Sequence, residues 1–212
     1  MSVKDFNKQY IYSELLESQI DPDPIKQFEM WFKESADKGI KYPNAFALST
    51  STLDGKPNSR FVLLKGFDKS GFVFYTNTES VKGEEINDNP NASMVFWWDM
   101  VERQVRINGT INLVSDEEAD EYFKSRPRGS QLGAWASKQS TVIENRDSID
   151  QSYAQVEKKY EGKDIPRPPY WHGYRLRPDS IEFWQGRPDR LHDRLRYRLQ
   201  KEDKWIIERL CP

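Results

Sequence analysis

Residues 45–78 read AFALSTSTLDGKPNSRFVLLKGFDKSGFVFYTNT, and here the hydrophobic period changes from helical to extended. The stretch contains three apolar runs, separated by turn signals at Asp54-Gly55 and at DKSG, residues 68–71. Short apolar runs divided by such turns are typical of antiparallel hairpins. The stretch therefore predicts a meander of three strands.

A helix is predicted just before this meander. Asp23 can cap its first turn, Pro24 suits the first helical position, and Gly39 is a natural stop. The apolar residues that fall on one helical face are Ile25, Phe28, Trp31 and Phe32. Residues 1–20 mix charged and apolar side chains, and we interpret them as an N-terminal arm.

The chain after the meander alternates strands with helices. The expected elements are a short helix at 81–88, strands at 92–98 and 103–114, a helix opened by a Ser115–Glu118 capping box, a loop at 126–140, a solvated helix at 140–163 and strands over 174–210. Without a clear linker or repeat, this pattern favours one α+β domain, residues 21–212, around an antiparallel sheet or small barrel.

The composition excludes several classes of protein. The 212 residues carry 32 basic and 34 acidic side chains, so the net charge of −2 argues against a nucleic-acid partner. One cysteine, Cys211, and two histidines argue against a disulfide framework or a metal centre. No run reaches the roughly 18 apolar residues of a membrane span and no signal peptide is visible, so we expect a cytoplasmic protein without a membrane partner.

The potential chemistry lies in cationic donors, since GxGxxG, P-loop and GxSxG motifs are absent. Arg60 and Lys65 flank FVLL at an odd spacing, so on a regular strand they would face two different anions. SRPRGS, residues 125–130, offers guanidinium and hydroxyl groups to a phosphate, and Tyr122 lies one turn earlier. The plainer interpretations are strand-end charges, a solvated basic loop and helix core.

A second concentration of donors lies near the C-terminus. EFWQGRPDRLHDRL, residues 182–195, contains Trp184, Arg190 and His192, which could wall a pocket for an anionic aromatic ligand. If the segment is extended, Leu191 points away, and Arg190 and His192 face one cavity. The plainer interpretation is a solvated basic strand.

Four motifs are familiar: RFVLLKGFDKSGFVFYTNTES, ERQVRINGT, YFKSRPRGSQLGAWASKQS and IEFWQGRPDRLHDR. In this order they resemble the pyridoxine/pyridoxamine 5′-phosphate oxidase family, over nearly the whole chain from about Pro24. The resemblance implies a mainly antiparallel FMN-binding split β-barrel with flanking helices, working as a homodimer with flavin at the subunit interface. It implies oxidation of pyridoxamine or pyridoxine 5′-phosphate to pyridoxal 5′-phosphate, with O2 as acceptor and H2O2 as product.

The resemblance also implies the residues of the site. The implied contacts to flavin mononucleotide, some of them from the partner subunit, are Arg60, Phe61, Val62, Leu63, Leu64, Lys65, Tyr75, Thr76, Lys82, Gln104, Gln139, Ser140, Trp184 and Arg194. The implied substrate contacts are Lys65, Tyr122, Arg126 and Ser130 at the phosphate, with Arg190 and His192 over the pyridine ring. Arg190 and His192 are the catalytic candidates, and Arg190 is the stronger because its fixed cation can stabilise developing negative charge.

The chain departs from the family pattern at three positions. Val81 stands where the family has an arginine before Lys82, so we expect flavin affinity to be lower by about tenfold to a hundredfold. His172 interrupts a Trp-Gly-Gly sequence, and Cys211 replaces an alanine. Because none of these is an implied substrate contact, we expect an active enzyme.

Two other functions stay open on the sequence alone. A non-catalytic FMN- or pyridoxal-phosphate-binding split barrel would bind its ligand without turnover. A split-barrel flavin reductase with a nicotinamide cofactor would not need Tyr122, Arg126 and Ser130.

Overall fold

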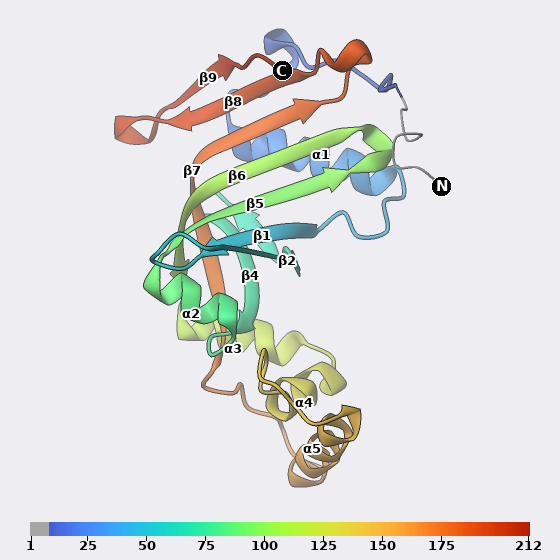
Figure 1. Ribbon diagram of the computed structural model, residues 1–212, viewed down its shortest axis with the longest axis vertical. Helices are drawn as coiled ribbons and strands as arrows, with labels where there is room; N and C mark the ends of the chain where they lie inside the picture. The colour runs from blue at the N-terminus through green and yellow to red at the C-terminus, as the bar shows by residue number, and fades with distance from the viewer. Residues whose placement is uncertain (1–8) are drawn as a thin grey trace.

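The structure, a computed structural model, describes residues 9–212 and is built on one antiparallel sheet that curls into a half-barrel (Figure 1). Its strands are β1 (Ala45–Ser51), β2 (Pro57–Leu63), β3 (Gly66–Asp68), β4 (Gly71–Asn77), β5 (Asn91–Trp98), β6 (Arg103–Leu113), β7 (Trp171–Gln185), β8 (Asp193–Leu199) and β9 (Trp205–Arg209). Its α-helices are α1 (Pro24–Asp37), α2 (Val81–Asp88), α3 (Asp116–Ser125), α4 (Arg128–Ala136) and α5 (Arg146–Lys159). The predicted α+β class with a mainly antiparallel split barrel is confirmed.

Strand β7 divides the sheet into two parts. The strands run in the order β2-β1-β5-β6-β7-β4-β3, and β8 and β9 extend the sheet from β7. The first half of β7 pairs with β4 and its second half with β8, while β6 follows it throughout. The β6–β7 register shifts at Asn108/Gly109, where a Cβ on Gly109 would stand 2.0 Å from the Arg177 carbonyl oxygen. Glycine is therefore required where the strands bend apart.

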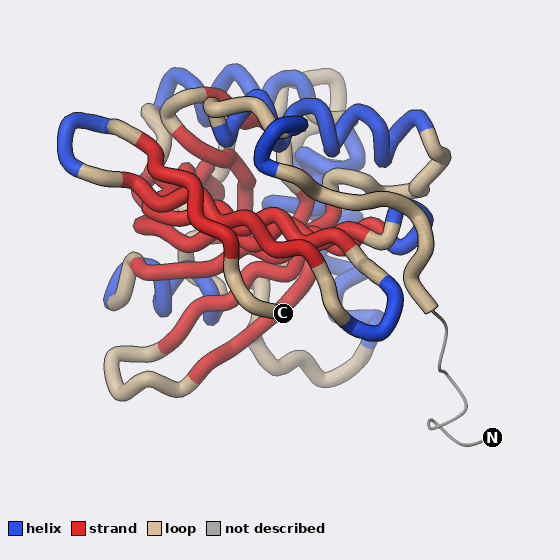
Figure 2. The backbone as a smooth tube through the Cα atoms, turned by 90° about the horizontal axis from the view of Figure 1, so that it is seen from above, coloured by secondary structure: helices blue, strands red, loops and turns tan. Residues whose placement is uncertain are grey.

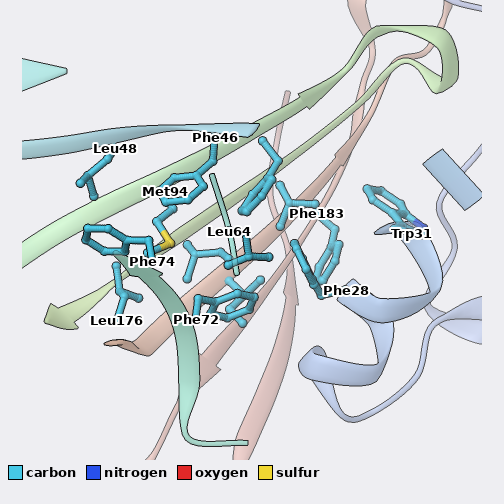
Figure 3. Packing of buried hydrophobic residues seen from close by; sticks show 14 of the residues in the cluster. Phe28, Trp31, Phe46, Leu48, Leu64, Phe72, Phe74, Met94, Leu176 and Phe183 are labelled. Atoms are coloured by element: carbon cyan, nitrogen blue, oxygen red, sulfur yellow. The ribbon is translucent and has the colours of Figure 1, made fainter. Parts of the chain in front are cut away.

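The predicted three-strand meander is wrong in its middle strand. The run at 58–67 breaks into β2 and β3, and these lie at opposite edges of the sheet. Between them, the Leu64 N–H donates to the Asn44 carbonyl at 2.8 Å and the Lys65 N–H donates to the Val73 carbonyl at 2.8 Å. This dipeptide thus joins the two edges, and Leu64 lies within the core cluster (Figure 3). Burial of Leu64 outweighs the local preference for a hairpin.

Helix α1 covers the core, as its apolar face predicts. The Asp23 side chain accepts a hydrogen bond from the Ile25 N–H at 2.9 Å, so the predicted cap is present. Phe28 is fully buried and Trp31 nearly so, and both point toward the aromatic side chains of the sheet (Figure 3). Phe28 meets Phe72 and Phe96 edge-on at about 5 Å between ring centroids, a geometry that aromatic pairs favour.

Helices α3, α4 and α5 gather at one end of the molecule, and β8 and β9 lie at the other (Figure 1). Seen from above, helices lie around the curved strands (Figure 2). The loop predicted at 126–140 is wrong because it contains α4, which buries Leu132 and Ala136, one helical turn apart, despite two glycines. The solvated helix predicted from residue 140 starts instead at Arg146, because the Asn145 side chain caps its first turn. Within residues 9–212 no helix is both long and apolar enough to cross a membrane.

Candidate cofactor and substrate site

A cavity of about 470 Å³ opens where the α3–α4 junction faces the barrel. Its lining residues are Leu63, Lys65, Tyr75, Tyr122, Ser125, Arg126, Pro127, Ser130 and Trp171. The cavity brings together the four residues that the resemblance assigns to the substrate phosphate: Lys65, Tyr122, Arg126 and Ser130. Lys65 reaches the cavity because the crossing between β2 and β3 sets it beside β4.

Arg126 is a half-buried cation without a counter-ion in the described structure. Its guanidinium lies over the ring of Trp171, with the guanidinium carbon 4.6 Å from the ring centroid, and its Nη1 is buried without a hydrogen-bond partner among residues 9–212. Burial lowers the pKa of Arg126. A buried polar group without a partner is costly, so this donor is suited to an anion inside the cavity.

Local structure fixes the position of Arg126. Ser115 caps α3 by accepting from the Glu118 N–H at 3.2 Å, which confirms half of the predicted capping box. Arg126 stands at the other end of α3, where its backbone N–H donates to the Phe123 carbonyl and the helix stops. Because Phe123 is buried and meets Trp171 edge-on at 5.0 Å, the helix end is pinned against β7.

One wall of the cavity is a stack of aromatic rings. Tyr75 is parallel to Tyr122 with ring centroids 4.0 Å apart, and to Trp171 at 5.2 Å. Burial and the nearby charge of Glu118 raise the pKa of Tyr75 to about 12, so its hydroxyl stays protonated at neutral pH. Tyr75 is a predicted flavin contact. In the structure its side chain lines this cavity, and the next residue on β4, Thr76, is also a predicted flavin contact.

Lys82 organises a second cationic group next to the first. Its Nζ donates to Gln139 Oε1 at 2.8 Å, to Ser80 Oγ at 3.0 Å and to Thr76 Oγ1 at 3.3 Å. Burial, with a smaller contribution from the charge of Arg60, lowers the pKa of Lys82 to about 8. Ser140 joins the group through its hydroxyl, which lies 3.4 Å from the Val81 nitrogen. The structure thus gathers the predicted flavin residues Thr76, Lys82, Gln139 and Ser140.

Arg60 enters this group from β2 and is held by a buried glutamate. Its Nη2 lies 3.3 Å from Glu85 Oε2, and Thr50 and Asn58 also donate to the Glu85 carboxylate. Burial raises the pKa of Glu85, but these hydrogen bonds and the charge of Arg60 outweigh it, so the pKa lies below its usual range. Arg60 and Lys65 therefore belong to two different groups, but the reason is the crossing after Leu63 and not the alternation along one regular strand that their spacing predicted.

The other predicted flavin residues on β2 and directly after it differ in exposure. Phe61 is 79% exposed and Leu63 39%, while Val62 packs against the core and Leu64 is buried. In the described part of the chain, strand β2 pairs only with β1, so the outer edge of its main chain carries N–H and C=O groups that no described strand pairs with. These main-chain groups can contact a ligand whether the side chain of the same residue is exposed or buried.

Gln104, Trp184 and Arg194 form a third group on β6, β7 and β8. Gln104 is the register partner of Trp184, and Trp184 is the register partner of Arg194, so the three side chains lie in one row across the sheet. Trp97 on β5 continues the row as the partner of Gln104 and is 48% exposed. Trp97 was not predicted, and only its exposure on a sheet face reveals it.

His192 lies in this third group, with its ring centroid 4.5 Å from that of Trp184. Its Nδ1 accepts from the Arg187 N–H at 3.1 Å, so the neutral ring carries its proton on Nε2. Burial and the charge of Arg190 lower the pKa of His192, which keeps the ring neutral at pH 7. The expectation of an extended segment is wrong, because Arg190 has a φ of 63° in a turn before β8.

The N-terminal segment also reaches this group. Tyr10 meets the rings of Trp184 and His192 edge-on, with centroids 5.6 and 5.4 Å away. The Glu102 carboxylate accepts from the N–H groups of Ile11 and Tyr12, each at 2.8 Å. Residues 9–12 of the predicted arm thus pack on the barrel, and residues 1–8 lie outside the described part. The sequence held no signal for the Tyr10 contact.

The third group lies far from the other two within one chain. Tyr75 pairs with Gly173 near the start of β7, and Trp184 stands eleven residues further along the same strand. At about 3.3 Å per residue, this separation is about 35 Å along the strand. The residues predicted to contact one flavin therefore divide into two sets that one chain does not bring together.

This open antiparallel barrel with two neighbouring cationic groups defines the class, a split-barrel protein. Residues 32–160 match the family described as pyridoxamine 5′-phosphate oxidase, and residues 171–212 match the pyridoxine 5′-phosphate oxidase C-terminal dimerisation region. The chain belongs to the pyridoxamine 5′-phosphate oxidase family, and it is an oxidoreductase.

Curated relatives agree over their full length. The chain is 52% identical to a pyridoxine/pyridoxamine 5′-phosphate oxidase of Gloeothece citriformis, covering 100% of this chain and 99% of that protein. It is 54% identical to one of Rubrobacter xylanophilus, covering 97% and 94%.

Solved structures show both the shared fold and some variety. PhzG from Burkholderia lata, in complex with tetrahydrophenazine-1-carboxylic acid, is 31% identical with a TM-score of 0.87, covering 93% of this chain and 98% of that one. An FMN-binding protein from Nostoc punctiforme, related to pyridoxamine 5′-phosphate oxidase, is 18% identical with a TM-score of 0.72, covering 91% and 100%. The second likeness concerns the fold alone.

Proposed function

We propose that the protein oxidises pyridoxamine 5′-phosphate and pyridoxine 5′-phosphate to pyridoxal 5′-phosphate, with FMN as cofactor and O2 as acceptor. The observation that carries the proposal is the cavity at the end of α3. There Arg126 presents a buried Nη1 that has no hydrogen-bond partner within the described residues 9–212, beside Lys65, Tyr122 and Ser130. Two cations and two hydroxyls suit a phosphate dianion. The names of the full-length relatives support the same substrate class.

The Lys82 group suits the phosphate of FMN. Arg60 and Lys82 supply two cations, and Ser140 supplies a hydroxyl at the same place. The free edge of β2 lies at the same end of the barrel as the Lys82 group. It can offer main-chain hydrogen bonds to the polar edge of the flavin ring. A bound flavin supplies the acceptor for the hydride of the substrate C4′ and passes the electrons to O2, giving H2O2.

The chain's own residues bind and orient the substrate. Lys65, Tyr122, Arg126 and Ser130 hold its phosphate at one end, which restricts the pyridine ring to few orientations. Arg190 holds the ring from the other side with a permanent charge. His192 donates from Nε2, because the Arg187 N–H occupies Nδ1. Oxidation of the amine consumes one water and releases ammonia, whereas oxidation of the alcohol needs no water.

Two copies of the chain complete each site in this proposal. Trp184, Arg190, His192 and Arg194 all lie in the segment that matches a dimerisation region. They stand at the end of β7 or after it, away from the start of β7 that pairs with β4 beside the Lys82 group. A homodimer supplies them from the second copy. Mixing a Lys82→Ala chain with a Trp184→Ala chain then restores flavin binding in about a quarter of the sites, since mixed dimers hold one intact site. Flavin binding no better than in either variant alone would contradict the shared site.

The PhzG likeness supports a second candidate, oxidation of a carboxylated tricyclic compound. One experiment distinguishes these candidate functions. The flavin-loaded protein is mixed with each candidate reductant in the absence of oxygen. We expect pyridoxamine 5′-phosphate to bleach the visible flavin band quickly, and pyridoxamine without its phosphate to do so slowly. Bleaching by a reduced nicotinamide or a phenazine precursor alone would favour the alternatives, and no bleaching by any of them would favour a non-catalytic binding protein.

A further inference from the structure

Glu182 is a buried carboxylate on the outer face of the sheet, where a charge would ordinarily be solvated. It stands two residues before Trp184 on β7, so both side chains leave the same face. Glu182 is only 2% exposed, and two arginines satisfy it: Arg106 Nη2 at 2.5 Å on one oxygen and Arg194 Nε at 2.9 Å on the other. Burying a carboxylate is costly unless it is paired in this way.

Arg194 is fixed from two sides. Its Nε donates to Glu182, and its Nη1 donates to the main-chain carbonyl of Cys211 at 2.9 Å. The last residues are themselves tied to β8, since the Leu210 N–H donates to the Arg194 carbonyl at 2.9 Å. Nη2 has no hydrogen-bond partner among residues 9–212, and the side chain lies in register with Trp184. Two of the three guanidinium nitrogens are therefore occupied by protein, and one is left for a ligand.

We propose that Glu182, together with the Cys211 carbonyl, is a positioning group that holds Arg194 ready for the cofactor of the neighbouring chain. The inference rests on the proposed FMN site and assigns a role to residues that touch no ligand. An arginine side chain loses conformational entropy when it binds a ligand. If other groups of the protein already fix the guanidinium, less entropy is lost on binding. The contact to residue 211 uses the main-chain carbonyl and not the cysteine side chain.

The same sheet contains a matched control. Glu208 on β9 also holds two arginines, Arg196 at 2.6 Å and Arg198 at 2.7 Å. Neither arginine belongs to the predicted flavin contacts. Glu208→Gln and Glu182→Gln therefore remove one carboxylate charge each from a two-arginine cluster, but only the second frees Arg194.

A double-mutant cycle on flavin affinity tests the proposal. The dissociation constant of FMN, measured by fluorescence quenching on apo-protein, is expected to rise about tenfold in Glu182→Gln and to stay unchanged in Glu208→Gln. In an Arg194→Ala background, Glu182→Gln is expected to have no further effect, because it acts only through that arginine. Equal, additive losses in both backgrounds would overturn the proposal and leave Glu182 as a merely structural charge.

A chain ending at Leu210 covers the case in which Glu182→Gln fails to fold. It removes the Cys211 carbonyl without disturbing the buried carboxylate, and FMN binding is expected to weaken about threefold to tenfold. Cys211→Ala, which keeps the carbonyl, is its control. An unchanged FMN affinity in the shortened chain would count against the positioning role. Failure of the wild-type protein to bind FMN would instead refute the proposed function.

Discussion

The guanidinium of Arg126 lies over the indole of Trp171, 4.6 Å from its ring centroid, while its Nη1 is buried without a partner among residues 9–212. The aromatic face holds the cation in place without neutralising it. Among residues 9–212 no carboxylate lines the cavity, so the charge of Arg126 is available to an incoming anion. The cavity therefore presents a fixed cation to an incoming anion.

Arg126→Ala is expected to impair binding and turnover of the phosphorylated substrate specifically. Loss of a charge-assisted hydrogen bond in a partly dry site should lower kcat/KM for pyridoxamine 5′-phosphate by about tenfold to a hundredfold. The comparison substrate is pyridoxamine, which lacks the phosphate and should respond little. A similar loss for both substrates would mean that Arg126 supports the fold rather than the phosphate.

The pH dependence of flavin binding should report on Lys82. Its pKa of about 8 means that it is charged below that pH and becomes neutral as the pH rises through it. The FMN phosphate is a dianion above about pH 6 and favours the charged lysine, so affinity should be greatest between about pH 6 and 8 and fall above it. Titrations across this range in wild type and Lys82→Arg test this, since arginine stays charged. A wild-type affinity that does not change above pH 8 would contradict it.

Val81→Arg is expected to tighten flavin binding. Val81 is the first residue of α2, is 43% exposed and adjoins Lys82 and Ser140, so an arginine has room to reach the same phosphate. One additional charge-assisted hydrogen bond would lower the FMN dissociation constant by about tenfold. The same reasoning predicts that Lys82→Ala costs more affinity in wild type than in the Val81→Arg background. Equal costs would show that residue 81 does not share the phosphate.

Arg190→Ala should weaken substrate binding and slow turnover, and His192→Ala should do so less. Arg190 offers a permanent charge, whereas burial and that same charge lower the pKa of His192 and keep it neutral. Neither variant should release flavin, because the cationic group at Lys82 is unaffected. Steady-state kinetics with flavin occupancy measured on the same samples decide this. Near-normal turnover of a fully loaded Arg190→Ala protein would remove the segment from the substrate site.

Sequence reasoning predicted the elements better than their arrangement. Asp23 and Ser115 cap helices through neighbours close in sequence, and the alternation of arginines in β8 is itself a local pattern, so these features were visible. The crossing at Leu64–Lys65 was missed because it depends on Asn44, just before β1, and on Val73 of β4, which lie on opposite sides of the sheet. Helix α4 was missed because its two glycines disfavour a helix, and the helical spacing of Leu132 and Ala136 is evident only from their burial.

The same limit applies to the site. The residues of the site could be named from the motifs. The distance between the two sets of flavin residues depends on the length of β7, Trp171–Gln185, which the sequence did not determine. The contacts of Tyr10 and Glu182 depend on partners that lie far away in the chain or on adjacent strands. Such tertiary pairs have no local pattern to reveal them.

The most direct test of the account is the product balance of the purified, flavin-loaded protein with pyridoxamine 5′-phosphate in air. We expect one pyridoxal 5′-phosphate and one H2O2 for each O2 consumed, and we expect this activity to fall sharply in Arg126→Ala. Bound flavin without any peroxide or aldehyde from either phosphorylated substrate would contradict it.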